Sequence, residues 1–578
     1  MFLLSLLLVP AAVPGVEAPA ATAPGLPASW DGRERAVAGA ISEQALAAHV
    51  RFLADDLLEG RGAGSRGDEL AMRYVAAQFE RLGLEPAGDG GGWLQRFELV
   101  GMTSQVTAPP VFSAPGRGGS PQRLELKPGV DMVVAPGQQR EALSLTDAEL
   151  VFVGYGIVAP EERWDDFKGV DVRGKVLVVM NNDPENDPAL FGGKARLYYG
   201  RWDYKYEEAA RHGAAGVIII HTTPSAAYPW QVVQSSWSHE LFELPAPAAG
   251  GGARPGAGPG ASQVGRLTAR MWATEEASRR LVALGGQDLD ALRRRAESRS
   301  FRPVPLGVRL SVALKTELRR FQTANVLGRL RGSDPVRGRE EVVFTAHHDH
   351  LGVGEAKNGD AIYNGALDNA SGVGMMLTMA EALSRAEPRP RRSIVFAAVA
   401  AEESNLLGSA YFMAHPTAPL GRLAANLNVD GINIWGKTLD VTLLGLGKST
   451  LDEVVRRVAG EQGRELTADP QPEKGSFYRS DQLSFARAGV PAVGLRTGTH
   501  FVGHEPKWGL DRIDEYVHTH YHQPSDQIDA TWRLDGAVDD ARLLVVTALR
   551  VADAPEMPAW RKGDEFEAAR LKALKALK

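Results

Sequence analysis

The chain has 578 residues, a formal net charge of −6 and no cysteine. At roughly 100–200 residues per domain, this length predicts two to four domains. A hydrophobic content of 44% is ordinary for a globular protein with a large core. The absence of cysteine excludes disulfides and thiolate metal ligands, and no basic stretch indicates a nucleic-acid surface.

The first residues, MFLLSLLLVPAAVPGVEAPA, predict a signal peptide over residues 1–20. An apolar run, Phe2 to Val9, precedes small residues and a candidate cleavage site, Ala18 to Ala20. The run departs from the usual pattern in having no Lys or Arg before it. It is too short to span a bilayer, so we expect a secreted or periplasmic protein without a membrane span in its mature form. Residues 21–40, rich in Ala, Pro and Gly, predict a linker.

Two amphipathic helices are expected at the start of the main domain, in residues 41–130. The first, ISEQALAAHVRFLADDLL, has Ser42 as its candidate N-cap. The second, GDELAMRYVAAQFERLGL, places Met72, Val75 and Phe79 on one face. We interpret both apolar faces as core.

Residues 131–300 predict a separate β-rich domain inserted into the main one. The runs ELVFVGYGI, GKVLVVMNN and GVIIIH are short strands between glycine-rich turns, and YKYEEAARHGA predicts a helix before the last of them. Residues 245–260, PAPAAGGGARPGAGPG, are low in complexity and predict a mobile surface loop.

Residues 301–555 alternate between strands and helices. The predicted strands are Val342–Ala346, Ile394–Ala400, Leu427–Val429 and Val490–Leu495. Continuous apolar strands separated by helices indicate a buried, largely parallel sheet, in which ligands bind beyond the carboxyl ends of the strands. Residues 556–578 predict a C-terminal tail helix, basic from Asp564 onward, that we expect to be solvated.

Acids and histidines follow these strands and one glycine-rich turn. They are His347, Asp349, Asp368, Glu402, Glu403, Asp430 and His522. Because side chains alternate along an extended chain, Asp349 points the same way as His347 and can orient its imidazole. Two adjacent carboxylates at a buried strand end need a cation or a proton to offset their repulsion.

This donor set predicts a metal site. Oxygen and imidazole ligands without sulfur suit zinc, with manganese or cobalt as substitutes. Three carboxylates and two histidines exceed the needs of one tetrahedral zinc, and they suit two metals about 3.5–4 Å apart that share a carboxylate.

Five motifs carry a family resemblance. TAHHDHLG, GALDNASG, AAEESNLLGS, NLNVDGI and YHQPSD, in this order, resemble the di-zinc aminopeptidases of metallopeptidase family M28. The segment HVRFLADDLLEGRGAGSRGDEL resembles the opening of that family, and VFVGYGIVAPEERWDDFKGVDVRGKVLVV resembles its inserted protease-associated (PA) domain. The resemblance spans most of residues 41–550 and implies an α/β fold with a mixed, largely parallel central sheet flanked by helices.

The resemblance also implies a role for each residue. His347 and Asp430 would hold one zinc ion, Glu403 and His522 would hold the other, and Asp368 would bridge them. Glu402 would be the general base, Asp349 would orient His347, and Tyr521 would stabilise the oxyanion. A cis peptide is expected between Asp368 and Asn369. This chain departs from many relatives at Leu367, where they carry an acid, and at His348, where they carry tyrosine.

The expected activity is hydrolysis of N-terminal amino acids from peptides with a free N-terminus, with Arg479 and His350 as candidate substrate contacts. Three alternatives stay open: a carboxypeptidase or dipeptidase on the same scaffold, with Arg496 as a weak candidate for gripping a carboxylate; a glutaminyl cyclase, which would lack the insertion; and a non-catalytic receptor-like relative. The preferred residue and the oligomeric state are not predicted.

Overall fold

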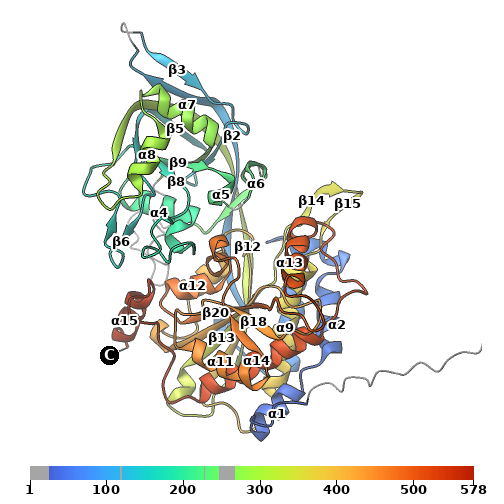
Figure 1. The fold of residues 1–578 in the computed structure, drawn as a ribbon. Coiled ribbons are helices and arrows are strands. Elements are labelled where there is room, and N and C mark those ends of the chain that lie inside the picture. The colour runs from blue at the N-terminus through green and yellow to red at the C-terminus, as the bar shows by residue number, and fades with distance from the viewer. Residues whose placement is uncertain (1–24, 117–119, 227, 238, 247–266, 578) are drawn as a thin grey trace, which may run out of the picture.

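The computed structural model describes residues 25–116, 120–226, 228–237, 239–246 and 267–577. Two lobes lie one above the other in Figure 1, and two long strands, β2 (Leu94–Ala114) and β12 (Val304–Leu330), run from one lobe into the other. The two strands pair antiparallel from Leu94↔Val326 to Ser113↔Arg309. We call residues 106–314 the inserted lobe and the remainder the main lobe. The predicted signal peptide lies outside the described residues.

The main lobe is built on a mixed sheet with the strand order β19-β18-β20-β17-β13-β16-β12. Its central strands are β16 (Ser393–Val399), β13 (Glu341–His347), β17 (Leu423–Val429) and β20 (Ala492–Thr497), and they are parallel to one another. The neighbours β12 and β18 (Asp440–Leu444) run antiparallel to them. The largely parallel sheet and its four predicted strands are therefore confirmed.

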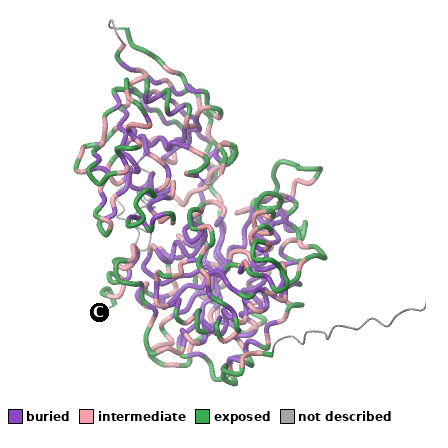
Figure 2. Tube along the Cα trace, viewed as in Figure 1, coloured by how far each residue is buried: buried purple, intermediate pink, exposed green. Residues whose placement is uncertain are grey.

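Helices cover both faces of this sheet. Val342, Phe344 and Ala346 of β13 face one apolar cluster, and Val343 faces another, as alternation along a strand requires. Figure 2 shows the buried chain concentrated along these strands. Helices on the first face are α1 (Gly32–Gly39), α2 (Glu43–Leu53), α3 (Arg66–Arg81), α9 (Ser371–Ser384), α11 (Leu451–Glu461) and α14 (Asp535–Asp553). Helices on the second face are α10 (Leu407–Ala414) and α12 (Gln482–Arg487).

The chain start agrees with the prediction in one helix and differs in another. Ser42 caps α2, where its side chain accepts from the Ala45 N–H. The assignment of residues 21–40 to a linker was wrong over its described part, because α1 forms there and Val37 and Ala38 pack into the main core. A capping box between Asp31 and Glu34 begins that helix. The Ala-, Pro- and Gly-rich composition of the segment gave no sign of a helix.

The C-terminal tail is docked rather than solvated. Helix α15 (Glu567–Lys575) follows Trp560 and Phe566, which are buried in the second-face cluster. Arg570 is 3% exposed, and its Nη1 donates to the Leu423 carbonyl at 2.9 Å. We expected a solvated helix because the tail is basic. The expectation was wrong because Trp560 and Phe566, which are buried against the main lobe, hold the tail in place.

The inserted lobe carries helices on both faces of its own sheet. The strands β5 (Ala142–Phe152), β8 (Val176–Met180), β9 (Gly216–His221) and β11 (Ala269–Thr274) are parallel, and β4 (Met132–Pro136) closes the edge antiparallel. Helices α7 (Glu275–Leu284) and α8 (Leu289–Ala296) cover one face, and α4 (Trp202–Arg211) and α6 (Trp230–Ser236) cover the other. The predicted helix before β9 is confirmed as α4. Most of the predicted low-complexity loop lies outside the described residues.

Polar contacts fix the inserted lobe to the main lobe. Arg487 binds Glu207 through two hydrogen bonds, of 2.9 and 3.0 Å. The backbone N–H of Arg196 donates to the Pro472 carbonyl at 3.1 Å, and the Arg201 guanidinium donates to the Tyr478 carbonyl. The inserted lobe therefore rests on the loop of residues 472–479.

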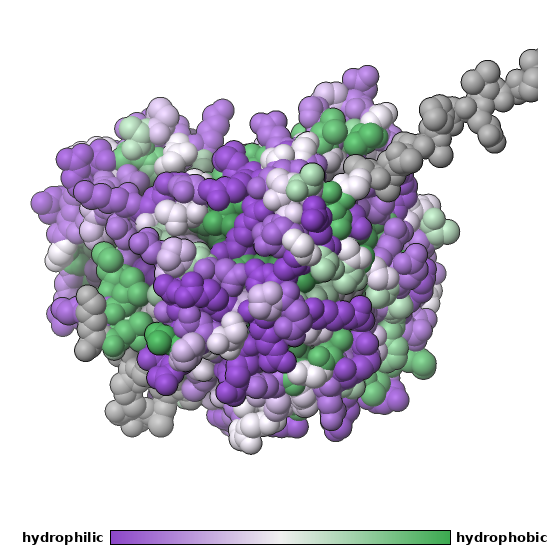
Figure 3. Space-filling view, turned by 90° about the horizontal axis from the view of Figure 1, so that it is seen from below, coloured by the Kyte–Doolittle hydropathy of each residue, from purple (hydrophilic) through white to green (hydrophobic). Residues whose placement is uncertain are grey.

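The remaining elements are short or peripheral. They include η1 (Asp56–Arg61), β1 (Glu85–Pro86), β3 (Gln122–Glu125), β6 (Val158–Ala159), β7 (Trp164–Asp165), α5 (Thr223–Ala226), β10 (Leu241–Glu243), β14 (Gly352–Lys357), β15 (Asp360–Tyr363), β19 (Glu465–Thr467), η9 (Ser476–Tyr478) and α13 (Trp508–Thr519). Within the described ranges, no helix combines the length and the apolar character that crossing a bilayer requires. The face turned away from the inserted lobe is mostly hydrophilic, with separate apolar patches (Figure 3).

Candidate metal centre

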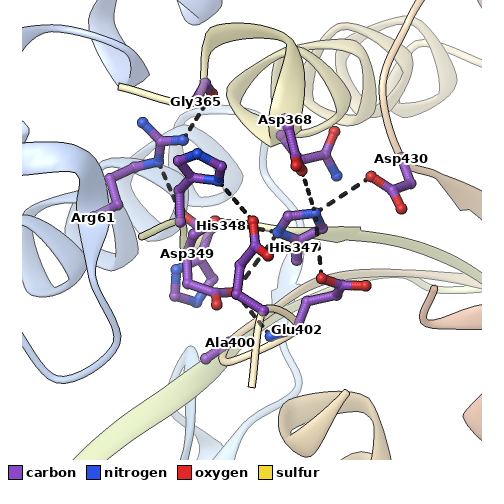
Figure 4. Close-up of polar contacts among 12 residues, drawn as sticks. Arg61, His347, His348, Asp349, Gly365, Asp368, Ala400, Glu402 and Asp430 are labelled. Atoms are coloured by element: carbon purple, nitrogen blue, oxygen red, sulfur yellow. Dashed lines mark hydrogen bonds and ion pairs between the residues drawn. The ribbon is translucent and has the colours of Figure 1, made fainter. Parts of the chain in front are cut away.

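Three neighbouring strands deliver acids and a histidine to one edge of the sheet. His347 is the last residue of β13, Glu402 follows β16 and Asp430 follows β17. Because these strands are parallel and adjacent, their carboxyl ends meet. Figure 4 shows the three side chains converging.

Asp368 comes from a turn that enters the same space. The turn, η6 (Ala366–Ala370), begins after Gly365 and leads into α9, and the expected cis peptide between Asp368 and Asn369 is present. Gly365 has a φ of +55°, and a Cβ there would lie 2.2 Å from the Asp368 carbonyl oxygen, so the turn requires glycine. Asn369 ties the turn to the Asp430 segment, since its amide donates to the Val429 carbonyl and accepts from the Gly431 N–H, both at 3.0 Å.

The two oxygens of Asp368 face two different groups of donors. Oδ1 lies 3.2 Å from His347 Nε2, which is itself 3.4 Å from Asp430 Oδ1. Oδ2 lies 3.3 Å from His522 Nε2, which is 3.1 Å from Glu403 Oε2. We call these the His347 set and the His522 set. Asp368 belongs to both.

These separations fit zinc. Ligands at about 2.0–2.2 Å from one tetrahedral ion lie roughly 3.3–3.6 Å from each other, and the four distances are close to that spacing. Glu403 Oε1 and His522 Nε2 are buried, and each lies beside another donor atom of the region, His350 Nδ1 at 2.7 Å and Glu403 Oε2 at 3.1 Å respectively. The donor atoms are those that zinc prefers, so the residues fit a pair of zinc ions.

His347 is held by Asp349, although not through the group that the sequence indicated. The Nδ1 atom of His347 lies 3.1 Å from the backbone carbonyl of Asp349 and 3.7 Å from its carboxylate. A proton on Nδ1 that is donated to this carbonyl leaves Nε2 free to bind a metal. The Asp349 carboxylate accepts from the Glu402 N–H at 3.1 Å and so holds the segment of the expected base.

His350 does not lie where a substrate contact would. It is 2% exposed, and its Nδ1 lies 2.7 Å from Glu403 Oε1. Ligand atoms of His350, Asp368 and Glu403 lie within 4.8 Å of one another, so the buried His350 ring lies next to the His522 set. The expectation of a substrate contact is corrected by this burial, which the motif alone did not reveal.

The two adjacent glutamates have opposite electrostatic environments. Burial raises the pKa of Glu402 well above its usual range, and Asp430 and Glu403 add to this rise while His347 opposes it. Burial would also raise the pKa of Glu403, but His522 and His350 together lower it to about 2. Glu402 therefore suits proton transfer, and Glu403 suits service as an ionised ligand.

The histidine of the second set is stabilised in its charged form. Burial would lower the pKa of His522, but Glu403 and Asp368 raise it to about 10. Its ring stacks on Tyr521, with 3.9 Å between ring centroids. Tyr521 is 40% exposed and lies at the solvent side of the centre.

Arg479 lies on the main-lobe loop, residues 472–479, that contacts the inserted lobe. It follows η9 and is exposed. Burial raises the pKa of Tyr228 in the inserted lobe, and the charge of Arg479 opposes this rise. Burial likewise raises the pKa of Tyr521, and the charge of Arg479 opposes that rise too, so Arg479 lies near both the inserted lobe and the centre.

Sequence reasoning assigned no role to two charged residues that contact the turn of Asp368. Asp526 accepts from the N–H groups of Leu367 and Asp368, and Arg61 donates to the carbonyls of Asn364 and Gly365. Both residues are buried. The sequence does hold a signal for each residue. Arg61 is a charged residue in the glycine-rich motif EGRGAGS, and Asp526 is a charged residue in the proline-containing motif HQPSD.

Part of the chain matches a known protein family. Residues 325–546 match the model of peptidase family M28. The matched segment is less than half of the chain. It contains every proposed ligand and Glu402, and it excludes the inserted lobe.

Curated relatives match parts of the chain. Aminopeptidase YwaD of Bacillus subtilis is 29% identical over 238 residues, which cover 40% of this chain and 46% of that protein. Aminopeptidase NAALADL1 of Mus musculus is 31% identical over 156 residues, or 26% of this chain and 19% of that protein. The matched segment therefore spans less than half of either relative.

Among solved structures, an aminopeptidase from Aneurinibacillus sp. strain AM-1 aligns with a TM-score of 0.46 at 18% identity, covering 91% of this chain and 97% of that one. A zinc aminopeptidase from Bacillus subtilis aligns with a TM-score of 0.40 at 19% identity, covering 91% and 98%.

Proposed function

We propose that this chain is a zinc-dependent aminopeptidase that removes N-terminal amino acids from peptides at a two-zinc centre. The observation that carries the proposal is the position of Asp368, whose two oxygens lie 3.2 and 3.3 Å from the Nε2 atoms of two different histidines. One carboxylate shared between two donor sets is the arrangement of a dinuclear hydrolase. The family match supports the same class.

The residues that would hold the ions are the two sets already defined. His347, Asp430 and Asp368 would hold one, and His522, Glu403 and Asp368 would hold the other. Bound zinc would supply Lewis acidity, which lowers the pKa of water to about 7 and polarises a carbonyl. Manganese or cobalt would be substitutes.

Glu402 would move the proton. Its Oε2 lies 4.0 Å from His347 Nε2, so the carboxylate faces the His347 set without joining its closer contacts. A carboxylate with a raised pKa can take a proton from water and return it to the leaving amine. The Asp349 carboxylate, through its hydrogen bond to the Glu402 N–H, would keep this side chain aimed at the centre.

Selection of a free amine would follow from the acidic surroundings. Glu402, Glu403, Asp368 and Asp430 share one small region, and a carboxylate oxygen there that binds no ion would accept a hydrogen bond from the ammonium group at the peptide terminus. Tyr521, at the solvent side of the centre, would donate to the developing oxyanion. Arg479 would contact the substrate farther from the reacting bond.

A carboxypeptidase or dipeptidase is the second candidate. The exposed positions of Arg479 and Arg496 favour it, because guanidinium groups bind carboxylates. Two curated relatives that match this chain are named aminopeptidases, and this favours the aminopeptidase over it.

The experiment is a panel of peptide substrates tested on the zinc-loaded chain and on Glu402→Gln. The panel pairs each peptide with its N-acetylated form and its C-terminal amide, and it includes peptides that begin with Gln. We expect cleavage only where the amine is free, indifference to the C-terminal amide, and release of amino acids rather than cyclisation. Equal cleavage of acetylated peptides, or a requirement for the C-terminal carboxylate, would contradict the aminopeptidase.

We also propose that the chain is exported and that the inserted lobe is a PA-type domain. The apolar run at Phe2–Val9 supports export. Support for the second point comes from the segment VFVGYGIVAPEERWDDFKGVDVRGKVLVV. The lobe contacts residues 472–479 and also Asn405, two residues after Glu403, and from there it would limit substrate size.

A further inference from the structure

Arg61 is a buried cation that binds backbone carbonyls. Its side chain is only 1% exposed. Nε donates to the His348 carbonyl at 2.9 Å, Nη1 donates to the Asn364 carbonyl at 2.6 Å and also to the Leu53 carbonyl, and Nη2 donates to the Gly365 carbonyl at 2.9 Å. One guanidinium therefore joins three separate segments of the chain.

Two of the segments that Arg61 joins carry proposed ligands. His348 is next to His347, and Gly365 begins the turn that presents Asp368. The backbone carbonyl of Arg61 also accepts from the His350 N–H at 3.2 Å. Figure 4 shows Arg61 beside Gly365 and the His348–Asp349 segment, with His347 and Asp368 beyond them. Arg61 thus sets the position of β13 relative to the turn.

Asp526 holds the same turn from its amide side. It is 2% exposed, and its two carboxylate oxygens accept from the N–H groups of Leu367 and Asp368 at 3.0 and 3.1 Å. The Tyr516 hydroxyl donates to the Asp526 carboxylate at 3.1 Å, and the backbone carbonyl of Asp526 accepts from the Ala366 N–H. Because Asp526 follows His522 by four residues, it links the bridging acid to the segment of the second set.

Burying these charges is costly unless the geometry needs them. An isolated buried charge is far less favourable than an apolar side chain of similar size, and buried charges are rarely kept for stability alone. The hydrogen bonds of the Arg61 guanidinium all go to backbone carbonyls, although the charges of four nearby acids, Asp349, Asp526, Asp368 and Asp68, favour the cation. Its planar fork can hold several carbonyls at once, which a lysine ammonium cannot do.

We infer that Arg61 and Asp526 are positioning residues that fix the distance between the two metal-binding sets, by gripping residues 364–368 from the carbonyl side and the amide side respectively. The inference rests on the proposed function, because it assumes that both sets bind zinc. Neither residue touches the donor atoms themselves. Their effect would act through the backbone that carries Asp368.

Arg392 provides a matched control. It is also 1% exposed, and its Nη1 donates to the carbonyls of Val551 and Ala554 at 2.8 and 2.7 Å, while its Nε donates to Glu340 Oε2 at 2.7 Å. It precedes Ser393, the first residue of β16, and so lies at the opposite end of the sheet from the centre. Arg392→Lys removes a similar carbonyl clamp without reaching Asp368.

The experiment compares Arg61→Lys, Asp526→Asn and Arg392→Lys in the full chain. Zinc affinity is measured by competition with a chromophoric chelator, the exchange coupling of the Mn²⁺-loaded chain by electron paramagnetic resonance, and folding by thermal melting. Loss of an outer partner of a metal ligand costs about 10–100-fold in affinity. We expect that loss for Arg61→Lys and Asp526→Asn, with altered Mn²⁺ coupling, and wild-type affinity for Arg392→Lys even where its Tm falls.

Two outcomes would overturn the inference. One is wild-type zinc affinity and coupling in both Arg61→Lys and Asp526→Asn. The other is an affinity loss in Arg392→Lys equal to that in Arg61→Lys, which would show a general effect of instability. Failure of the proposed function itself would look different, because the unsubstituted chain would then bind fewer than two zinc ions.

Discussion

The carboxylates of Glu402 and Glu403 are consecutive in the chain, yet they face different donor sets. Glu402 Oε2 lies 4.0 Å from His347 Nε2, whereas Glu403 Oε2 lies 3.1 Å from His522 Nε2. Their pKa values are displaced in opposite directions, upward for Glu402 and to about 2 for Glu403. Adjacent residues therefore suit two different tasks.

Glu402→Gln and Glu403→Gln should have different effects. We expect Glu402→Gln to keep both zinc ions and to lose kcat by about 10²–10⁴-fold, since it removes a general base. Glu403→Gln should instead weaken binding of one zinc ion, because a neutral amide replaces an ionised ligand. Elemental analysis and steady-state kinetics on the same preparations check both. Full activity in Glu402→Gln would refute its assignment as the base.

Removing zinc should destabilise the chain. An ion that binds only the folded state stabilises it by about 4 kcal/mol when present at 1,000 times its Kd. We expect EDTA to lower the Tm and an excess of zinc to restore it. An unchanged Tm, after elemental analysis has shown that the metal is gone, would argue against a structural link between the ion and these five ligands.

The stability of the metal-free chain should fall as the pH rises above neutrality. The pKa of His522 is raised from 6.5 to about 10, so the folded state keeps a proton that the unfolded state has released. The stabilisation is complete below pH 6.5 and is lost as the pH rises through about 10. Thermal melts of the EDTA-treated chain between pH 7 and 10 measure this, with His522→Gln as the comparison. Equal pH slopes in both would show that His522 does not hold the proton.

Docking of the inserted lobe should depend on Glu207 and Arg487. Their side chains are only 6% and 16% exposed, and the Tyr198 hydroxyl also donates to Glu207 at 2.6 Å. Removing one partner of a buried ion pair costs about 3–5 kcal/mol, so Glu207→Gln should lower the free energy of unfolding by an amount of that order.

An exposed ion pair gives the control for this prediction. Glu69 and Arg73 of α3 are 57% and 70% exposed, and Glu69→Gln should cost at most about 1 kcal/mol. Urea unfolding measures both variants. Similar small losses in the two would mean that the lobes are held by apolar contacts instead.

The sequence predicted the features of the centre that depend on strand direction. The apolar runs located β13, β16 and β17, and because parallel strands share their carboxyl edge, His347, Glu402 and Asp430 had to lie near one another. The motif order supplied Asp368 and His522, which come from turns that no periodicity describes.

Contacts that depend on the backbone could not be predicted in this way. A sequence does not tell whether His347 meets the carboxylate of Asp349 or its carbonyl, and the structure shows the carbonyl to be nearer. Nor does it show that the buried His350 contacts Glu403. It also does not show that α1 forms in an Ala- and Gly-rich stretch once Val37 and Ala38 can pack into the main core. Burial of one element by others decides all three.

The most direct measurement is anomalous scattering at the zinc edge from crystals of the zinc-loaded chain. The account predicts two peaks, about 3.5–4 Å apart, one beside each carboxylate oxygen of Asp368. A single peak, no peak, or peaks away from His347 and His522 would contradict it.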